Sequence, residues 1–192
     1  MTENLAEGVQ SFTSNVFLVD GDRTVLVDPG SNFDVVAALE ERDVALDAVV
    51  LTHTHPDHVG NVDAVKSALD VDAWGYDPDH QAVDAELTDG DRIRIGNADY
   101  RVLHTPGHKN DHVCLYSAEA STLFSGDLVF AGGGFGRTDL EEGDRERLVR
   151  SIEYVLETVT DDFAVMHAGH GPSVDQNPFA DVQTALRMAR AQ

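Results

Sequence analysis

The chain has little of several things that mark particular classes of protein. Among its 192 residues there is one cysteine, Cys114, so no disulfide can form within the chain. No apolar run approaches the roughly 18 residues that a membrane-spanning helix needs, so we expect no membrane segment. The first twenty residues hold no basic start and no long apolar stretch, so no secretory signal is expected. We therefore expect a cytoplasmic protein.

Basic residues are also scarce. Thirteen Lys and Arg stand against 35 Asp and Glu, and Lys66 and Lys109 are the only lysines, which leaves a formal charge of -22. We expect no nucleic acid partner, because binding a phosphate backbone normally requires a basic stripe that this sequence lacks. Molar salt, where the Debye length is about 3 Å, would screen the self-repulsion. Scarce lysine with abundant aspartate favours a halophilic source over an ordinary acidic surface.

The length and the 42% content of hydrophobic residues fit one folded domain over residues 1–192. Alternating apolar patterns predict strands and helices in turn, hence sheets covered by helices. The predicted strands are Asn15 to Val19 and Thr24 to Asp28 (a hairpin), Ala48 to Leu51, Ala73 to Tyr76, Arg92 to Ile95, Tyr100 to Leu103, His112 to Tyr116, Thr122 to Phe124 and Phe163 to Met166. The predicted helices are Phe33 to Glu41, Asn61 to Leu69, Asp144 to Val159 with Asp144 as N-cap, and Phe179 to Arg190.

The most informative stretch runs from Thr52 to His58 and reads Thr-His-Thr-His-Pro-Asp-His. Chance would place such an H-x-H-x-D-H pattern in roughly two chains per thousand of this composition. In extended backbone His53 and His55 project to the same side, so both can reach one metal ion. The chain turns at Pro56, which can direct Asp57 and His58 to a second point nearby.

Three further polar residues sit beside glycines at predicted strand ends or turns. They are His108 in Thr-Pro-Gly-His, Asp127 in Ser-Gly-Asp and His170 in Gly-His-Gly-Pro. Glycine permits unusual dihedrals and a close backbone approach, which suits a ligand-bearing loop. Each residue taken alone could be an ordinary turn residue, but together with the histidine cluster they favour a metal centre.

Metal binding also accounts for the charges of this set. Seven ionisable side chains gathered without a cation would leave two carboxylates repelling each other, at a cost of several kcal/mol per uncompensated ion. Structural zinc contributes on the order of 10 to 16 kcal/mol, which more than offsets that cost. Imidazole and carboxylate ligands without thiolate suit zinc, manganese or iron, and the sequence does not choose among them.

Together with Asp28-Pro29-Gly30, these motifs resemble those of the metallo-β-lactamase superfamily over nearly the whole chain. The resemblance implies an αββα sandwich, an α/β architecture of four layers. It implies two divalent metal ions, most commonly zinc, with one held by His53, His55, His108 and Asp127. It implies that the second is held by Asp57, His58, Asp127 and His170, with Asp127 bridging.

Within this superfamily the chain most resembles glyoxalase II-like thioester hydrolases. True β-lactamases commonly carry cysteine where this chain has Asp127, so antibiotic hydrolysis is not expected. The resemblance implies attack by a metal-bound hydroxide on a small acyl-thiol, with Asp57 orienting the hydroxide. Full-length glyoxalase II enzymes add a C-terminal helical domain, and we expect none here.

Two other functions compete with this one. A persulfide dioxygenase would use a single iron ion held by fewer of the same residues. A metal-stabilised binding protein is disfavoured, because the ligand set exceeds what a closed structural site uses. Metal content and the substrate turned over would separate the three.

Some residues near the motifs have two interpretations. Asp28 either accepts a hydrogen bond from a ligand histidine or caps its own turn. Arg137, in a Gly-Arg-Thr-Asp loop, either binds a substrate carboxylate or pairs with Asp139. Packing or hydrogen bonding is the more economical explanation for His104, His112 and His167, and burial in a strand for Cys114.

Overall fold

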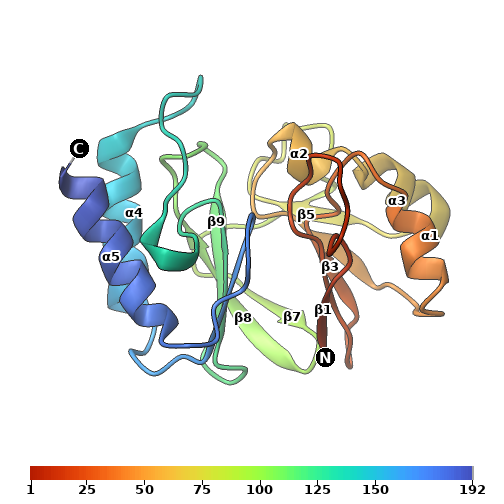
Figure 1. Cartoon of the computed structure of the whole chain (residues 1–192). Helices are drawn as coiled ribbons and strands as arrows, with labels where there is room; N and C mark the ends of the chain where they lie inside the picture. The colour runs from red at the N-terminus through yellow and green to blue at the C-terminus, as the bar shows by residue number, and fades with distance from the viewer. Residues whose placement is uncertain (192) are drawn as a thin grey trace. The chain divides into compact units, whose positions relative to one another are not determined.

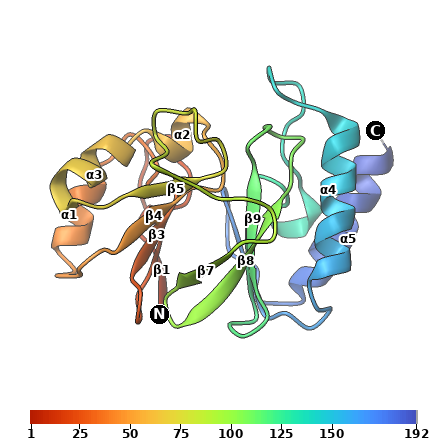
Figure 2. The same ribbon diagram turned by 180° about the vertical axis from the view of Figure 1, so that it is seen from behind.

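A computed structural model describes residues 1–191 (Figures 1 and 2). The chain forms two compact units, each with its own sheet and helices. The first unit comprises Met1–Leu87 with Arg94–Ala98, and the second comprises Thr88–Ile93 with the chain from Asp99 onward. No helix in the described part of the chain has both the length and the apolar content needed to cross a membrane.

The first unit is built on a six-stranded mixed sheet in the order β1-β2-β3-β4-β5-β6. β1, β2 and β3 are antiparallel neighbours, whereas β3 to β6 run parallel. The strands are β1 (Thr2–Asn4), β2 (Phe17–Val19), β3 (Val25–Val27), β4 (Ala48–Val50), β5 (Ala73–Gly75) and β6 (Ala85–Glu86). The helices are α1 (Val35–Glu40), α2 (Pro56–Val59) and α3 (Val62–Leu69).

The core of the first unit lies between this sheet and its helices. β2, β3 and β4 are buried at every position, as expected for strands covered on both faces. Leu26 and Val49 of the sheet join Leu39 of α1 and Val65 of α3 in one apolar cluster. Parallel β3 and β4 end at the same edge, so the residues that follow them are brought together.

The second unit contains a five-stranded sheet in the order β11-β10-β9-β8-β7. β8, β9 and β10 are antiparallel neighbours, and β10 and β11 are parallel. The strands are β7 (Arg92–Ile95), β8 (Ala98–His104), β9 (Val113–Ser117), β10 (Thr122–Gly126) and β11 (Val165–Ala168). The 3-10 turn η1 (Ala131–Gly133) and the helices α4 (Arg145–Thr158) and α5 (Pro178–Ala191) complete the unit.

Helices α4 and α5 pack on this second sheet through one apolar stripe each (Figure 1). Leu148, Ile152 and Val155 of α4 are fully buried, at the helical spacing that the sequence predicts. Asp144 is the N-cap of α4, and its carboxylate accepts the backbone N–H of Arg147 at 2.9 Å. The predicted cap is therefore confirmed.

Most predicted elements are present, with differences at their ends. The predicted hairpin is confirmed by the pairing of Phe17 with Val27, and β7 has the predicted bounds. β11 begins at Val165 rather than Phe163, because Phe163 lies in a turn in which its N–H donates to the carbonyl of Thr160. The sequence did not predict β1, β6, α2 or η1, which are short or polar and carry no apolar period.

Candidate metal centre

The first group of predicted ligands lies on the segment that leaves β4. His53 and His55 lie between β4 and α2, and His55 forms the N-cap of α2 in extended backbone with φ -67° and ψ 145°. Pro56 is the first residue of α2, a position where its missing N–H costs nothing. The turn expected at Pro56 is thus a single helical turn, which carries Asp57 and His58.

The rings of His53 and His55 present nitrogen atoms to a common point. Nε2 of His53 lies 3.0 Å from Nδ1 of His55, and the two rings meet edge to face. Two nitrogens on one tetrahedral zinc ion, each at 2.0–2.1 Å, would lie about 3.3 Å apart. The spacing of these donors therefore fits two ligands of one metal ion.

Asp28 connects two of the histidines to each other. Its Oδ2 lies 2.8 Å from Nδ1 of His58 and accepts the hydroxyl of Thr52 at 2.6 Å. The oxygen of that hydroxyl lies 3.1 Å from Nδ1 of His53. Because Thr52 donates to Asp28, it accepts from His53, and Nδ1 therefore carries the proton in both rings. Nε2 of His53 and of His58 is left with a lone pair for a metal ion.

Asp57 and His58 supply the other donors of this unit. Oδ2 of Asp57 lies 3.9 Å from Nε2 of His58, and the His58 side chain is completely buried. The backbone carbonyl of Asp57 accepts the N–H of Ser14 at 3.2 Å, which fixes the helical turn to the loop before β2. Both side chains are held where they can share a metal ion.

The second group of predicted ligands lies in the second unit. His108, Asp127 and His170 follow the carboxyl ends of β8, β10 and β11, which point in the same direction and so end at one edge of the sheet. Oδ2 of Asp127 lies 3.4 Å from Nε2 of His108 and 3.6 Å from Nε2 of His170. These distances are short enough for the carboxylate and either imidazole to bind the same metal ion.

The loop that carries His108 is held against α4. A Cβ atom on Gly107, where φ is +134°, would lie 2.2 Å from the backbone nitrogen of Leu148, so only glycine fits. The N–H of Asp144 donates to the carbonyl of Gly107 at 2.8 Å, and the hydroxyl of Ser151 donates to the carbonyl of Pro106 at 2.7 Å. These contacts fix the loop on the first turns of the helix.

Arg137 contacts the predicted ligand His108 through its backbone carbonyl rather than through its guanidinium. Its carbonyl oxygen lies 2.8 Å from Nδ1 of His108 and accepts that N–H, which leaves Nε2 available to a metal. The guanidinium forms two hydrogen bonds with Asp139, at 2.9 and 2.8 Å, and both side chains are exposed. The Arg137 guanidinium lowers the pKa of the Asp139 carboxyl, mainly by hydrogen bonding. The pair with Asp139 is therefore present, and substrate binding by Arg137 stays a prediction.

His112 holds the backbone of Asp127. Its buried Nε2 accepts the N–H of Asp127 at 2.9 Å, and its Nδ1 lies 2.8 Å from the hydroxyl oxygen of Thr105. Since Nε2 accepts, Nδ1 carries the proton and donates to Thr105. The expected packed histidine is confirmed, but its contact fixes the position of a predicted ligand.

His104, His167 and Cys114, for which the sequence favours a structural role, make hydrogen bonds or are buried. Nε2 of His104 donates to the carbonyl of Asn110 at 2.8 Å, and Nδ1 of His167 lies 2.8 Å from the hydroxyl of Ser173. Burial lowers the pKa of His167 to about 4. Burial raises the pKa of the Cys114 thiol to about 12, so this cysteine is neither a nucleophile nor a ready ligand.

Each unit therefore brings its own predicted ligands together. The donors are imidazole nitrogens and carboxylate oxygens, and His53, His58 and His108 each have Nδ1 engaged by a second group. Such a donor set fits a centre of two divalent metal ions. Sequence reasoning left Asp28 and His112 outside the site, although a carboxylate before Pro-Gly and a histidine four residues after His108 were visible signals.

Comparison with known proteins supports this assignment. The family model of the metallo-beta-lactamase superfamily matches residues 10–170. The hydroxyacylglutathione hydrolase GloC of Haemophilus influenzae is 32% identical over 188 residues, which cover 85% of this chain and 88% of that protein. A hydroxyacylglutathione hydrolase of Chromohalobacter salexigens is 37% identical over 173 residues, which cover 88% of this chain and 65% of that longer enzyme.

Solved structures share the fold. TTHA1623, in a di-iron-bound form, has a TM-score of 0.76 and 28% identity, with 98% of this chain and 96% of that chain covered. The B3 metallo-beta-lactamase BLEG-1 has a TM-score of 0.78 and 28% identity, with 93% of this chain and 99% of that chain covered. ETHE1 from Myxococcus xanthus has a TM-score of 0.80 at 23% identity, covering 99% and 90%, which shows a common fold alone. The predicted fold class, α and β with two mixed sheets and helices, is confirmed.

Proposed function

Because the chain belongs to the metallo-β-lactamase superfamily and is a metallohydrolase, we propose that it hydrolyses a thioester as glyoxalase II-like enzymes do. One observation carries the proposal. Asp127 places a carboxylate oxygen between His108 and His170, at 3.4 and 3.6 Å, where a β-lactamase commonly has a thiolate. The similarity to GloC over 88% of that enzyme supports the same activity.

The proposed metal ligands are the seven predicted residues. One ion is assigned to His53, His55, His108 and Asp127, and the other to Asp57, His58, Asp127 and His170. The hydrogen bonds to Nδ1 of His53, His58 and His108 support this assignment, because each orients the ring with Nε2 directed away from its anchor. Zinc is the proposed metal, with iron or manganese as the alternatives.

The chemistry follows from these donors. Two bound divalent ions would supply Lewis acidity and lower the pKa of water from 15.7 toward about 7, which provides hydroxide at neutral pH. Asp57 would orient the attacking hydroxide by accepting a hydrogen bond from it, and its helical turn is held to Ser14. His112 accepts the backbone N–H of Asp127 and so holds the backbone from which this carboxylate extends. The acyl group leaves as a carboxylic acid and the carrier as a thiol.

Metal content and turnover on one preparation test the proposal. We expect two equivalents of metal per chain and hydrolysis of S-lactoylglutathione that chelation abolishes. Asp127→Asn is expected to lower both, whereas Asp161→Asn, an exposed carboxylate of the same unit, changes neither. Two metals without hydrolysis of any acyl-thiol would contradict the thioesterase assignment.

The alternative is a persulfide dioxygenase. The similarity in fold to ETHE1, with a TM-score of 0.80, keeps this alternative open, and the hydrolases match at higher sequence identity. One iron ion per chain with oxygen uptake on a glutathione persulfide, and no loss of thioester, would establish the dioxygenase instead.

Three further parts of the proposal concern the thiol carrier, the cellular location and the source of the enzyme. The thiol carrier is a small molecule, which we propose to bind beside Arg137. A cytoplasmic location and a halophilic source stay predictions, and the comparisons give no support to the halophile. Thermal unfolding from 0.1 to 2 M KCl tests the halophile directly, since screening of the -22 charge would raise the midpoint steadily with salt.

A further inference from the structure

A groove between α4 and the loop after β8 is lined by basic rather than acidic residues, although the chain as a whole is acidic. Its volume is about 280 Å³, and it is lined by His104, Pro106, Arg147, Arg150, Ser151 and Tyr154. No carboxylate belongs to this lining, although the chain has 35 acidic residues and 13 basic ones. Two arginines and no acidic residue line this hollow.

Four of the lining residues form one stripe of the helix. Arg147, Arg150, Ser151 and Tyr154 follow one another at i, i+3, i+4 and i+7, so their side chains lie on one face. The two arginines are neighbours on that face, and like charges at such spacing repel each other. An anion between them would convert this repulsion into two attractions.

The guanidinium groups keep donors available. The guanidinium of Arg147 donates one N–H to the side-chain oxygen of Asn110 at 2.6 Å, and no other described residue accepts a hydrogen bond from this guanidinium. Arg150 lies 3.7 Å from Glu146, beyond hydrogen-bond distance, and both of these side chains are largely exposed, at 62% and 87%. The planar guanidinium group matches the two oxygens of a carboxylate or phosphate.

The walls of the groove are fixed. Ser151 donates its hydroxyl to the carbonyl of Pro106, and the hydroxyl of Tyr154 lies 3.2 Å from a terminal nitrogen of Arg101. Asp89 lies beside the groove, where its carboxylate accepts the backbone N–H of His104 and contacts the hydroxyl of Tyr154. The walls formed by Ser151 and Tyr154 are therefore in place before a ligand binds.

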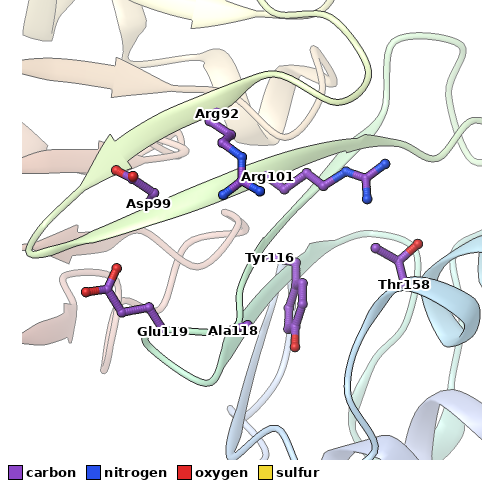
Figure 3. A pocket seen from close by; sticks show the side chains of 7 residues that line it. All are labelled: Arg92, Asp99, Arg101, Tyr116, Ala118, Glu119 and Thr158. Atoms are coloured by element: carbon purple, nitrogen blue, oxygen red, sulfur yellow. The ribbon is translucent and has the colours of Figure 1, made fainter.

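A second hollow of the same unit shows that arginines alone do not make such a site. Figure 3 shows Arg92 and Arg101 in a hollow of about 280 Å³ together with the carboxylates of Asp99 and Glu119. Its positive and negative charges balance, and Arg92 lies on β7 at the edge of the sheet, where charged side chains prevent edge-to-edge pairing. The groove on α4 has no such acidic wall.

We propose that the groove on α4 binds the oxyanion group of a small molecule, a phosphate or a carboxylate, between Arg147 and Arg150. The groove shares Pro106 with the loop that carries His108, and Arg147 holds Asn110 of the same loop. The bound oxyanion lies behind this loop and contacts none of the proposed metal ligands. The site does not depend on the proposed thioesterase activity.

Titration of the metal-loaded protein with inorganic phosphate at low salt tests the proposal. The readout is the side-chain Nε–H resonances of the arginines, observed by NMR. We expect saturable shifts of Arg147 and Arg150, a dissociation constant about tenfold or more higher in the variant with both Arg147→Gln and Arg150→Gln, and weaker binding as salt rises. Arg92→Gln is the matched control and should bind as the wild type does.

If the double variant binds phosphate as tightly as the wild type does, the proposed site is wrong. The anion would then bind elsewhere, for example at the metal ions. The absence of saturable shifts, or an equal loss in Arg92→Gln, would overturn it as well. If the double variant unfolds, Arg150→Gln alone serves, because the side chain of Arg150 is 62% exposed. Parallel titrations with acetate distinguish the ligand, since tighter binding of phosphate indicates a phosphorylated compound and tighter binding of acetate a carboxylic acid.

Discussion

Nδ1 of His58 lies 2.8 Å from Oδ2 of Asp28, and both side chains are buried. Asp28 has a left-handed backbone with φ +53° at the end of β3, which directs its carboxylate toward the loop after β4. A buried carboxylate in this position orients His58 directly and His53 through Thr52. Its hydrogen bonds therefore determine which ring nitrogens are available to a metal ion.

Asp28→Asn is predicted to weaken metal binding by about 10 to 100-fold while the fold is kept. Asparagine tolerates a positive φ, so the change removes the charge and one acceptor without backbone strain. Competition with a chromophoric chelator measures the affinity. Asp22→Asn, at an exposed carboxylate of the same unit, is the control and should bind metal like the wild type. Unchanged affinity in Asp28→Asn would show that the histidines need no such support.

His112→Phe is predicted to lower both stability and metal affinity. The N–H of Asp127 and the hydroxyl of Thr105 would each lose a buried partner, at about 1–3 kcal/mol apiece. Urea denaturation measures the stability, and the spectrum of the cobalt-substituted protein reports the ligand geometry. His112→Gln, which can restore an acceptor, should recover part of the cobalt spectrum. A spectrum identical to the wild type in His112→Phe would mean that His112 only fills space.

Gly136→Ala is predicted to disrupt the centre. A Cβ atom there would lie 2.0 Å from the carbonyl oxygen of Asp127 and 3.0 Å from the ring of His108, so both ligands must move. We expect a destabilisation of about 1–3 kcal/mol and a loss of bound metal, measured by denaturation and elemental analysis. Gly134→Ala is the matched control, because its Cβ would meet nothing closer than 3.5 Å and φ is -63°. Full metal content in Gly136→Ala would contradict the described positions.

Arg137→Ala is predicted to raise the KM for the acyl-thiol by about tenfold, with kcat little changed, if its guanidinium binds a substrate carboxylate. The thermal midpoint should stay the same, because the pair with Asp139 is exposed to water and screened. Steady-state kinetics and a melting curve measure both quantities. An unchanged KM would restrict Arg137 to its carbonyl contact with His108.

His167→Gln is predicted to flatten the loss of stability in acid. Burial lowers the pKa of His167 to about 4, from 6.5 when unfolded, so the unfolded chain binds more protons between these values. The contribution of the neutral ring to stability is present above pH 6.5 and is lost as the pH falls through 4. At pH 5 the wild type should have lost about 2 kcal/mol more than the variant, relative to pH 7.5, in urea titrations. Parallel losses in the two proteins would contradict this role.

The identity of the metal donors could be predicted from local sequence. His53, His55, Asp57 and His58 stand within six positions, and their pattern is rare enough to indicate a metal by itself. The long apolar periods of α3, α4 and α5 predicted these helices to within two residues of their ends. Periodicity could not predict β1, β6 or α2, because such short segments depend on pairing or packing with distant residues rather than on their own pattern.

The amino-acid sequence alone determined which side chains are available, the acidic charge of the chain and the amphipathic faces that build both units. The tertiary structure decided how those side chains are used. Asp28 meets His58 because β3 and β4 are parallel and end at the same edge of a sheet, and His112 meets Asp127 because β9 and β10 are neighbours. Hydrogen bonds of this kind join residues that are distant in the chain, so their partners are set by strand order and register, which no local pattern contains.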